Sequence, residues 1–423
     1  MSAFALSIAI FVLAYAFIVH DKIHRTLVAL AGAVIVVFAH VITQKQAVAA
    51  IDFNTLGLLI GMMIIVAIMQ KSGVFEYMAI QSVRAVKGHP LAILAALGII
   101  TAFTSAFLNN VTIVMLMVPI TYAITDRLEI NPIPYLFTEI LASNIGGTAT
   151  LIGDPPNIMI GSAVGFGFMD FIRNVTVPNI IILLATVGVL MFVYRKALVA
   201  DDEKIQGLMT LNAVDYIREW NLMWKSVAVM LLTIIGFLVG DHFHIDAATI
   251  ALAGAVLLLL LASENPEEIF ISVEWSTIFF FIGLFVMVGG LEATGVIEWL
   301  ARESLKLTGG QLVPTGMLVL WMSAILSAFV DNIPLVAAMI PMLQEVGRLT
   351  GMQMDSIWWA LSLGACLGGN GTLVGASANV VVAGLAARYG NRITFMDYLK
   401  VGFPLMILSM VISSVYMYLV YWM

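Results

Sequence analysis

Long apolar runs separated by short polar segments dominate the sequence. Runs such as residues 5–19, 27–39, 180–193 and 247–262 approach the roughly 20 residues that an α-helix needs to cross a bilayer about 30 Å thick. Such runs exclude a transmembrane β-barrel, whose strands alternate apolar and polar residues. The pattern predicts an all-α polytopic membrane protein.

The same pattern returns in the second half of the chain at one fixed offset. The hexapeptide ALAGAV occurs at residues 29–34 and again at 251–256. The stretch LASNIGGTATLIGDPPN at 141–157 returns without a gap, at the same offset, as LGACLGGNGTLVGASAN at 363–379. The same distance along the chain, from residue 29 to residue 251, separates many matching positions and indicates an internal duplication. We call this distance the repeat offset.

The duplication divides the chain into two repeats and a linker. Residues 200–221 form the only long polar stretch, so we expect them to join a first repeat, 1–199, to a second repeat, 222–423. If each repeat crosses the membrane five times, the second is inserted upside down relative to the first. The expected fold is therefore an inverted-repeat ion transporter fold with about ten transmembrane helices.

Two apolar units, residues 91–125 and 312–347, are consistent either with single spans or with re-entrant hairpins. The positions of Lys and Arg separate these alternatives, because cytoplasmic loops carry an excess of both. With hairpins, most of the 19 Lys and Arg fall on one side, Lys22 and Arg25 among them, whereas single spans distribute them more evenly. We therefore expect two re-entrant hairpins, a cytoplasmic linker and extracytoplasmic termini.

Polar residues interrupt the apolar pattern at four places. Two are the hairpin tips, and two lie in spans expected to unwind, residues 134–166 and 357–385. Irregular backbone at membrane depth persists only where protein buries it or where it lines a wet cavity. The four breaks are therefore expected to meet near the midplane, where carbonyl groups, half-helix ends and Asn, Ser and Thr side chains offer ligands to a small ion or solute.

Two of the breaks contain a carboxylate. Asp154 lies in the first unwound span and Asp331 at the second tip, and an ionisable side chain in an apolar region is a candidate functional group. The halves differ here, because Asn109 stands at the position of Asp331 and Ala376 at that of Asp154. Either carboxylate could exchange a coupling proton. The alternative for Asp154 is to cap the half-helix that begins at Pro155.

Composition narrows the chemistry further. The chain is 61% hydrophobic and 11% charged, and its one cysteine, Cys366, rules out an internal disulfide. No metal-binding signature, cofactor motif or nucleic-acid partner is expected, and without a GxxxxGK[ST] loop the energy must come from an ion gradient or from a soluble ATPase partner. Glu139 and Glu292 lie nearer the ends of their spans, from where they could reach the membrane interface.

Four segments carry a resemblance to a known family: FLNNVTIVMLMVPIT from 107, NIGGTATLIGDPPNIMIG from 144, FVDNIPLVAAMIPML from 329 and LGACLGGNGTLVGASANVVVAG from 363. They resemble the arsenite-permease and P-protein branch of the ion transporter superfamily, which includes NhaD-type sodium/proton antiporters and, more distantly, divalent anion/sodium symporters. The resemblance implies a scaffold and a transport domain, a homodimer and an elevator-like movement.

The resemblance also implies an ion site at the tips and unwound spans. Carried onto this sequence, the site comprises Ser105, Asn109, Asn110, Thr112, Thr148, Thr150, Asp154, Asn157, Ser327, Asp331, Asn332, Asn370, Thr372, Ser377 and Asn379. The carboxylate symporters have Ser-Asn-Thr at both tips, whereas this chain has Leu-Asn-Asn and Val-Asp-Asn. This departure, and two carboxylates that would repel a dianion, disfavour a dicarboxylate substrate.

The first functional hypothesis is a proton-coupled antiporter in the cell (inner) membrane that exports arsenite, antimonite or a related small inorganic solute. The second is a sodium/proton antiporter, for which buried acids and carbonyl oxygens are equally suitable. An anion channel is a third class, and it has no need of proton-carrying acids. An intramembrane aspartyl protease is disfavoured, because Gly153-Asp154 is only half of its motif. We therefore expect a transporter and not an enzyme.

Overall fold

The computed structural model describes residues 2–20 and 23–423, and within these residues the chain forms helices and no β-strand. The expected all-α class is confirmed. Lys22, which the charge distribution places on the cytoplasmic side, lies outside the described residues.

The helices of the first repeat lie close to the expected spans. They are α1 (Ala3–His20), α2 (Arg25–Phe38), α3 (Gln44–Ala49), α4 (Phe53–Ser72), α5 (Val74–Ala85), α6 (Pro90–Ser105), α7 (Asn110–Leu128), α8 (Ile133–Thr148), α9 (Pro155–Val164), α10 (Phe168–Asn174) and α11 (Thr176–Tyr194). The linker contains α12 (Asp202–Met209) and η1 (Ala213–Tyr216).

The second repeat reproduces this series. Its helices are α13 (Trp220–Gly240), η2 (Asp241–Phe243), α14 (Ala247–Ala262), α15 (Pro266–Ile271), α16 (Trp275–Ala293), α17 (Val296–Thr308), α18 (Leu312–Phe329), α19 (Asn332–Thr350), α20 (Asp355–Gly368), α21 (Ser377–Arg388), α22 (Phe395–Met417) and η3 (Tyr418–Trp422). Each helix from α14 to α21 begins at the repeat offset from its counterpart in the series α2 to α9. The sequence repeat is therefore also a repeat of helix boundaries.

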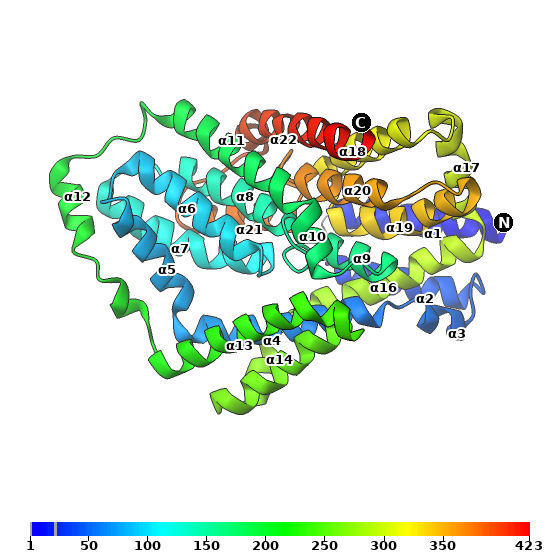
Figure 1. Cartoon of the computed structure of the whole chain (residues 1–423), viewed down its shortest axis with the longest axis horizontal. Coiled ribbons are helices and arrows are strands. Elements are labelled where there is room, and N and C mark those ends of the chain that lie inside the picture. Colours follow the sequence, from blue (N-terminus) through cyan, green and yellow to red (C-terminus); the bar gives the residue numbers. More distant parts are fainter. Residues whose placement is uncertain (1, 21–22) are drawn as a thin grey trace.

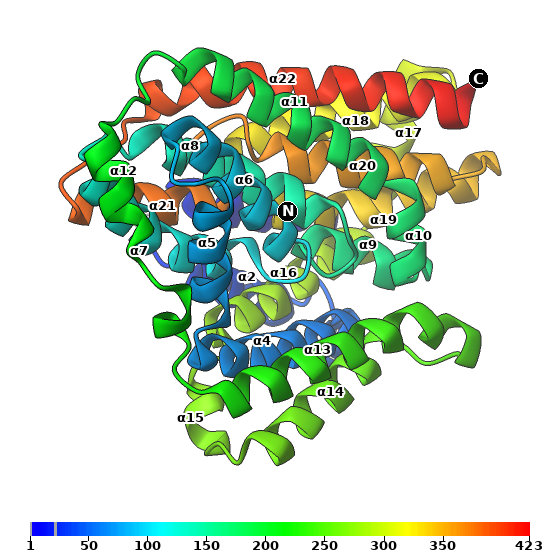
Figure 2. The ribbon, with the colours of Figure 1, turned by 60° about the vertical axis from the view of Figure 1, so that its left-hand side comes forward.

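Helices of the two repeats exchange partners. Helix α2 packs on α16 and α14 packs on α4, while α9 packs on α19 and α21 on α7. Two groups of helices result from these contacts. The first helix set consists of α1, α2, α4, α13, α14 and α16. The second helix set consists of α6 to α9 and α18 to α22. Figures 1 and 2 show α4, α13 and α14 together along one edge, with α11 and α22 on the opposite side.

Short non-helical segments separate the helices at the four expected breaks. Residues 106–109 and 330–331 form the tips, and residues 149–154 and 369–376 interrupt the two broken spans. Among the described helices, seven have the length and hydropathy of a membrane span, and several shorter apolar helices accompany them. The number of crossings, the re-entrant course of the hairpins and the inverted orientation remain predictions.

Candidate functional site

The two tips have the same local structure. Asn109 precedes α7, and its Oδ1 accepts a hydrogen bond from the Val111 backbone N–H at 2.9 Å. Asp331 precedes α19, and its Oδ1 accepts one from the Ile333 N–H at 3.1 Å. A side-chain oxygen here satisfies one of the free N–H groups at a helix start. Asp331 therefore caps its helix as Asn109 does and keeps Oδ2 for other contacts.

At the two unwound breaks, an asparagine holds the backbone. Asn157 Nδ2 donates to the carbonyl oxygens of Thr148 and Thr150, at 3.0 and 2.8 Å. In the second repeat, Asn379 Nδ2 donates to the carbonyl oxygens of Gly369 and Thr372, at 2.8 and 2.9 Å. These carbonyl groups, which the sequence suggested as ion ligands, thus already accept hydrogen bonds.

Hydroxyl groups fasten the tips to the broken helices in the same symmetric way. Ser105 Oγ donates to Ser143 O at 2.7 Å, Ser327 Oγ to Ala365 O at 2.6 Å, Thr150 Oγ1 to Ala106 O and Thr372 Oγ1 to Ala328 O. The Thr148 hydroxyl donates within α8, to Asn144 O at 2.7 Å. We conclude that these side chains shape the site.

A small cavity lies where the tips and breaks meet, and we call it the inner cavity. Its volume is about 40 Å³. Its polar lining consists of Arg25, Asn109, Asn110, Asn144, Asp154, Glu274, Thr277, Asn332 and Ser377. Both helix sets contribute, because Arg25 begins α2 and Glu274 immediately precedes α16.

Asn144 connects the two repeats beside this cavity. Its Nδ2 donates to Asn370 Oδ1 at 2.9 Å and to Asn379 Oδ1 at 3.0 Å. The side-chain amide of Asn110, from the first tip, lies 3.2 Å away. All four side chains are buried, and these contacts meet part of the hydrogen-bonding need that burial creates.

Asp154 is a buried carboxylate on the inner cavity, only 3% exposed. It stands at the N-cap position of α9, but its side chain makes no capping bond. Instead, its Oδ2 accepts a hydrogen bond from Asn332 Nδ2, at 3.2 Å, from the opposite tip. None of the ion pairs found among the described residues includes Asp154. Because the Asp154 side chain makes no capping bond, the alternative in which it caps α9 is wrong.

Asp331, in contrast, has a cation partner. Arg25 Nη1 lies 3.0 Å from its Oδ2 and also donates to Ser377 Oγ at 2.6 Å. The Ser377 hydroxyl donates to the same carboxylate oxygen at 3.0 Å. The Arg25 guanidinium also lies over the Phe280 ring, 5.3 Å from its centroid.

The structure brings together part of the expected site. Five of the expected residues line the inner cavity: Asn109, Asn110, Asp154, Asn332 and Ser377. Asp331 lies next to it through Ser377, and Asn370 and Asn379 adjoin it through Asn144. Thr112 lines the neighbouring pocket at the first tip instead, with its hydroxyl 3.4 Å from Glu274 Oε1.

Sequence reasoning missed Arg25, Asn144, Glu274 and Thr277 as lining residues. The charge distribution places Arg25 on the cytoplasmic side, but it gives no sign that the side chain contacts the second tip. Asn144 had a visible signal, since it stands in the polar stretch at 141–157. Glu274 had a weaker one, because its counterpart at the repeat offset, Asp52, is also acidic.

Glu139 does not reach the molecular surface. Its side chain is 0% exposed, and the Thr121 hydroxyl donates to its Oε1. Helix α7 packs against α8, and its Thr121 contacts the Glu139 carboxyl group, which is therefore buried between helices.

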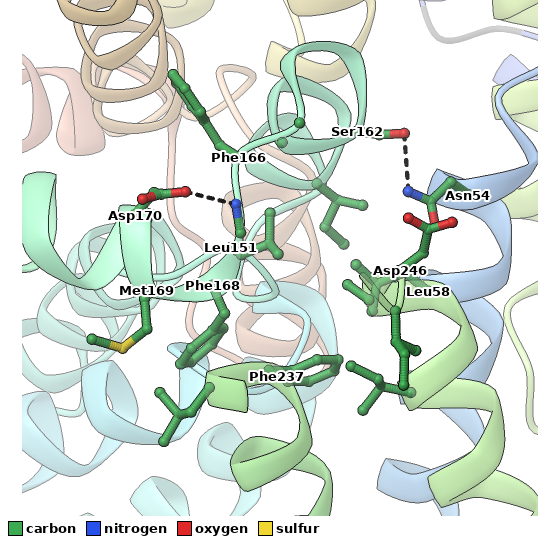
Figure 3. Close-up of a pocket in the computed structure, with 18 of the residues that line it drawn as sticks. Asn54, Leu58, Leu151, Ser162, Phe166, Phe168, Met169, Asp170, Phe237 and Asp246 are labelled. Atoms are coloured by element: carbon green, nitrogen blue, oxygen red, sulfur yellow. Dashed lines mark hydrogen bonds between the residues drawn. The ribbon is translucent and has the colours of Figure 1, made fainter. Parts of the chain in front are cut away.

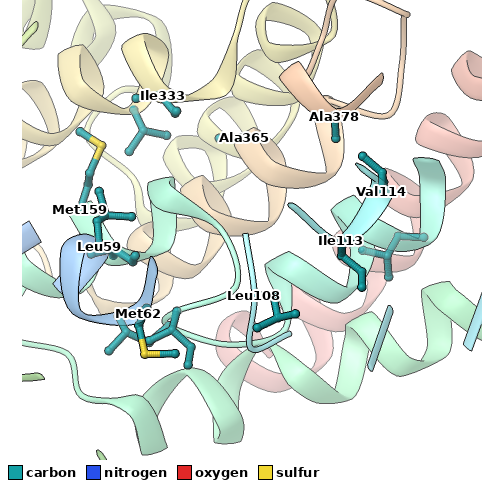
Figure 4. Close-up of a cluster of buried hydrophobic side chains, with 14 of the residues drawn as sticks. Leu59, Met62, Leu108, Ile113, Val114, Met159, Ile333, Ala365 and Ala378 are labelled. Atoms are coloured by element: carbon teal, nitrogen blue, oxygen red, sulfur yellow. The ribbon is translucent and has the colours of Figure 1, made fainter. Parts of the chain in front are cut away.

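Apolar side chains enclose the first tip. Leu108 is buried and lines a pocket of about 60 Å³ with Leu59 and Met62 of α4. Figure 4 shows these residues with Met159 of α9 and Ile333 of α19. Asn109 and Glu274 line both this pocket and the inner cavity, so they lie in the wall between the two.

A larger pocket, about 700 Å³, lies elsewhere, between α9, α10 and the loop before α14. Figure 3 shows its aromatic side chains Phe166, Phe168 and Phe237, and the hydrogen bond of 3.4 Å from Asn54 to Ser162. None of the described residues that line it belongs to the expected site.

Comparison with known proteins identifies the family. The sequence model of a family described as "Citrate transporter" matches residues 15–364. The chain belongs to the citrate transporter family. It is also 32% identical to the human P protein over 487 residues, in an alignment that covers 95% of this chain and 58% of that protein. The expected relation to the P-protein branch is thus confirmed.

Two bacterial relatives match this chain almost from end to end. The uncharacterized transporter Rv2684 of Mycobacterium tuberculosis is 42% identical over 421 residues, and the 46 kDa membrane protein of Mycobacterium leprae is 40% identical over 422 residues. Each alignment covers 98% of both chains. The protein is therefore a membrane transporter.

Solved structures support the fold. The YdaH transporter of Alcanivorax borkumensis has a TM-score of 0.61 at 14% identity, with 99% of this chain and 98% of that chain covered. MtrF of Neisseria gonorrhoeae, described as illuminating a class of antimetabolite efflux pumps, has a TM-score of 0.63 at 13% identity, with coverage of 99% and 94%. At these identities the likeness establishes the fold alone.

Proposed function

We propose that the protein is a proton-coupled secondary transporter that exports a small inorganic solute, with Asp154 as the proton-binding group. One observation carries the proposal: Asp154 is buried on the inner cavity without a cation partner among the described residues, whereas Asp331 is paired with Arg25. A buried carboxylate without a counter-ion is costly, and binding of a proton or a cation removes that cost. We therefore assign the coupling proton to Asp154 and the ion pair to Asp331.

Arsenite or antimonite is the proposed solute. Arsenite is a neutral trihydroxide near neutral pH, and the amide and hydroxyl groups of Asn110, Asn144 and Thr277 can bind hydroxyl groups without a cationic pocket. The small volume of the inner cavity supports a small solute. Although the family is described by citrate, Asp154 and Glu274 outnumber the cationic Arg25 in the lining and disfavour a trianion.

Sodium/proton exchange is the second candidate function. Asp154 and Glu274 line the same cavity as the side-chain amides of Asn110 and Asn332. Carboxylate and amide oxygens are the ligands that a small hard cation prefers. Exchange of Na⁺ for a proton on Asp154 would use this lining directly.

Transport by purified protein in proteoliposomes, under an imposed pH gradient, tests the proposal. We would measure uptake of arsenite, Na⁺ and citrate for the wild type, Asp154→Asn, Asp331→Asn and the exposed linker control Glu203→Gln. We expect gradient-driven arsenite uptake in the wild type and Glu203→Gln, and a fall to the level of protein-free liposomes in Asp154→Asn. The asparagine cannot take up a proton but preserves the side-chain shape.

The other outcomes would each overturn part of the proposal. Sodium exchange without arsenite movement would transfer the assignment to the second candidate, and citrate uptake would replace the proposed solute. Gradient-driven uptake that Asp154→Asn leaves intact would remove Asp154 from the coupling role. A conductance that persists when Asp154 and Asp331 are both neutralised would indicate a channel.

A further inference from the structure

Arg25 lies in the wall between two cavities. The first is the inner cavity of about 40 Å³ that holds Asp154. The second, which we call the outer pocket, has a volume of about 260 Å³ and is lined by residues that include Ile18, His24 and Asp331. Arg25, Ala376 and Ser377 line both. Two of these three residues, Arg25 and Ser377, bind Asp331.

Three polar contacts close this wall. Arg25 Nη1 contacts Asp331 Oδ2 at 3.0 Å and Ser377 Oγ at 2.6 Å, and Ser377 Oγ donates to Asp331 Oδ2 at 3.0 Å. Arg25 starts α2 of the first helix set, while Asp331 immediately precedes α19 and Ser377 starts α21 of the second. The two contacts of Arg25 therefore join the helix sets and would break if the sets moved apart, whereas the Ser377–Asp331 hydrogen bond lies within the second set.

We propose that Arg25, Asp331 and Ser377 form a gate that closes the inner cavity toward the outer pocket. The proposal rests on the proposed function, in which the inner cavity is the transport site. Opening the gate separates one ion pair and one hydrogen bond, both made by Arg25, and connects Asp154 with the outer pocket. Arg25 is thus a positioning residue for transport.

The gate exists on one side only. At the repeat offset, the counterparts of Arg25, Asp331 and Ser377 are Ala247, Asn109 and Pro155, and these cannot form an ion pair. Duplication would have produced equivalent closures on both sides, so the charged gate distinguishes one access route from the other. A weakened gate is expected to change access from the outer pocket alone.

Several ionisable groups face the gate. His24 lies beside Arg25 in the outer pocket, and Tyr15 of α1 is within electrostatic reach of Asp331. Asp154 and Glu274 face Arg25 across the inner cavity. The gate is therefore probed best by changing its own charges at constant pH.

The rate at which a single engineered cysteine reacts with a charged methanethiosulfonate reagent measures the gate. In a Cys366→Ala background, Ala378→Cys places a thiol on the inner cavity, where Ala378 is 1% exposed. Val374→Cys places one in the outer pocket, where Val374 is 48% exposed, and serves as the matched control. Both would be labelled in proteoliposomes without any transport assay.

We expect Arg25→Gln and Asp331→Asn to accelerate labelling at position 378 by about tenfold or more and to leave position 374 unchanged, since each loses the ion pair. Asp331→Asn keeps the cap of α19, as Asn109 does for α7. Arg25→Lys is expected to give a smaller increase, and the reversed pair Arg25→Asp with Asp331→Arg to slow labelling again.

Unchanged labelling at position 378 in both Arg25→Gln and Asp331→Asn would overturn the gate. The same holds if positions 374 and 378 accelerate together, because that result indicates general loosening. Accelerated labelling at position 378 alone, in a protein that moves no solute with protons, would support the gate and refute the proposed function.

Discussion

Glu139 is a buried carboxyl group outside the inner cavity. The Thr121 hydroxyl donates to its Oε1, and its Oε2 has no partner among the described residues. The equivalent position of the second repeat holds Leu361, so the fold itself does not require an acid there. Glu139 lies in α8, the helix that also carries Asn144 of the inner cavity, and its carboxyl group contacts Thr121 of α7.

Substitution at this position should separate shape from charge. Glu139→Gln keeps an acceptor for Thr121, so we expect an unfolding temperature in detergent close to that of the wild type. Glu139→Ala leaves a cavity and an unsatisfied hydroxyl and should cost about 2–4 kcal/mol. If Gln proved as damaging as Ala, the carboxyl group itself would be required.

At the same scale, the sequence predicts some site residues and not others. Asp154, Asn110 and Asn332 could be found because each interrupts an apolar run and has a defined place in the repeat. Arg25 and Glu274 could not, because charged residues are ordinary at helix starts. Their role depends on which helices of the two repeats meet, and no local pattern encodes that pairing.

Among the elements, α6 with α8 and α18 with α20 pack through glycine. A Cβ added at Gly368 would lie 2.5 Å from the Ala324 carbonyl oxygen, and one added at Gly146 would meet the Ala102 backbone in the same way. The close approach places α8 and α20, which end at the unwound breaks, directly against α6 and α18, which end at the tips. Only glycine permits this distance between two helix backbones.

We therefore expect Gly368→Ala and Gly146→Ala to destabilise the protein by about 1–3 kcal/mol through overpacking. Gly384→Ala is the matched control, because a Cβ there meets nothing within 4 Å and the residue lies inside α21. Denaturation in detergent should show a loss for the first two and none for the control. Equal losses for all three would instead indicate a general effect of glycine on helices.

The positions of the elements were largely predictable, since apolar periodicity, Pro155-Pro156 and the paired glycines mark where helices begin and end. The unwound breaks follow from residues that disfavour a helix in an apolar run. What the pattern could not provide is that Asn157 and Asn379 satisfy the broken backbone, because those bonds depend on the loop conformation.

At the scale of the whole molecule, the charge distribution predicts the orientation of the chain in the membrane. The charge distribution places the linker in the cytoplasm and both termini outside, and Lys204 of α12 joins the linker to Glu129, at 2.7 Å, beyond the end of α7. Alkaline phosphatase, which is active only outside the cytoplasm, should be inactive when fused after residue 210 and active at the C-terminus. Activity after residue 210 would contradict the predicted orientation.

The exchanged pairing of α2 with α16 has a consequence for biosynthesis. Helix α2 leaves the ribosome long before its partner, since α2 begins at Arg25 and α16 only at Trp275. At about 5–20 residues per second, this delay amounts to roughly 12–50 s. Throughout that interval the face of α2 that will contact α16 must be covered by lipid, the insertion machinery or an earlier helix. The newly made first repeat is therefore an assembly intermediate, and it is completed only when the second repeat has been synthesised.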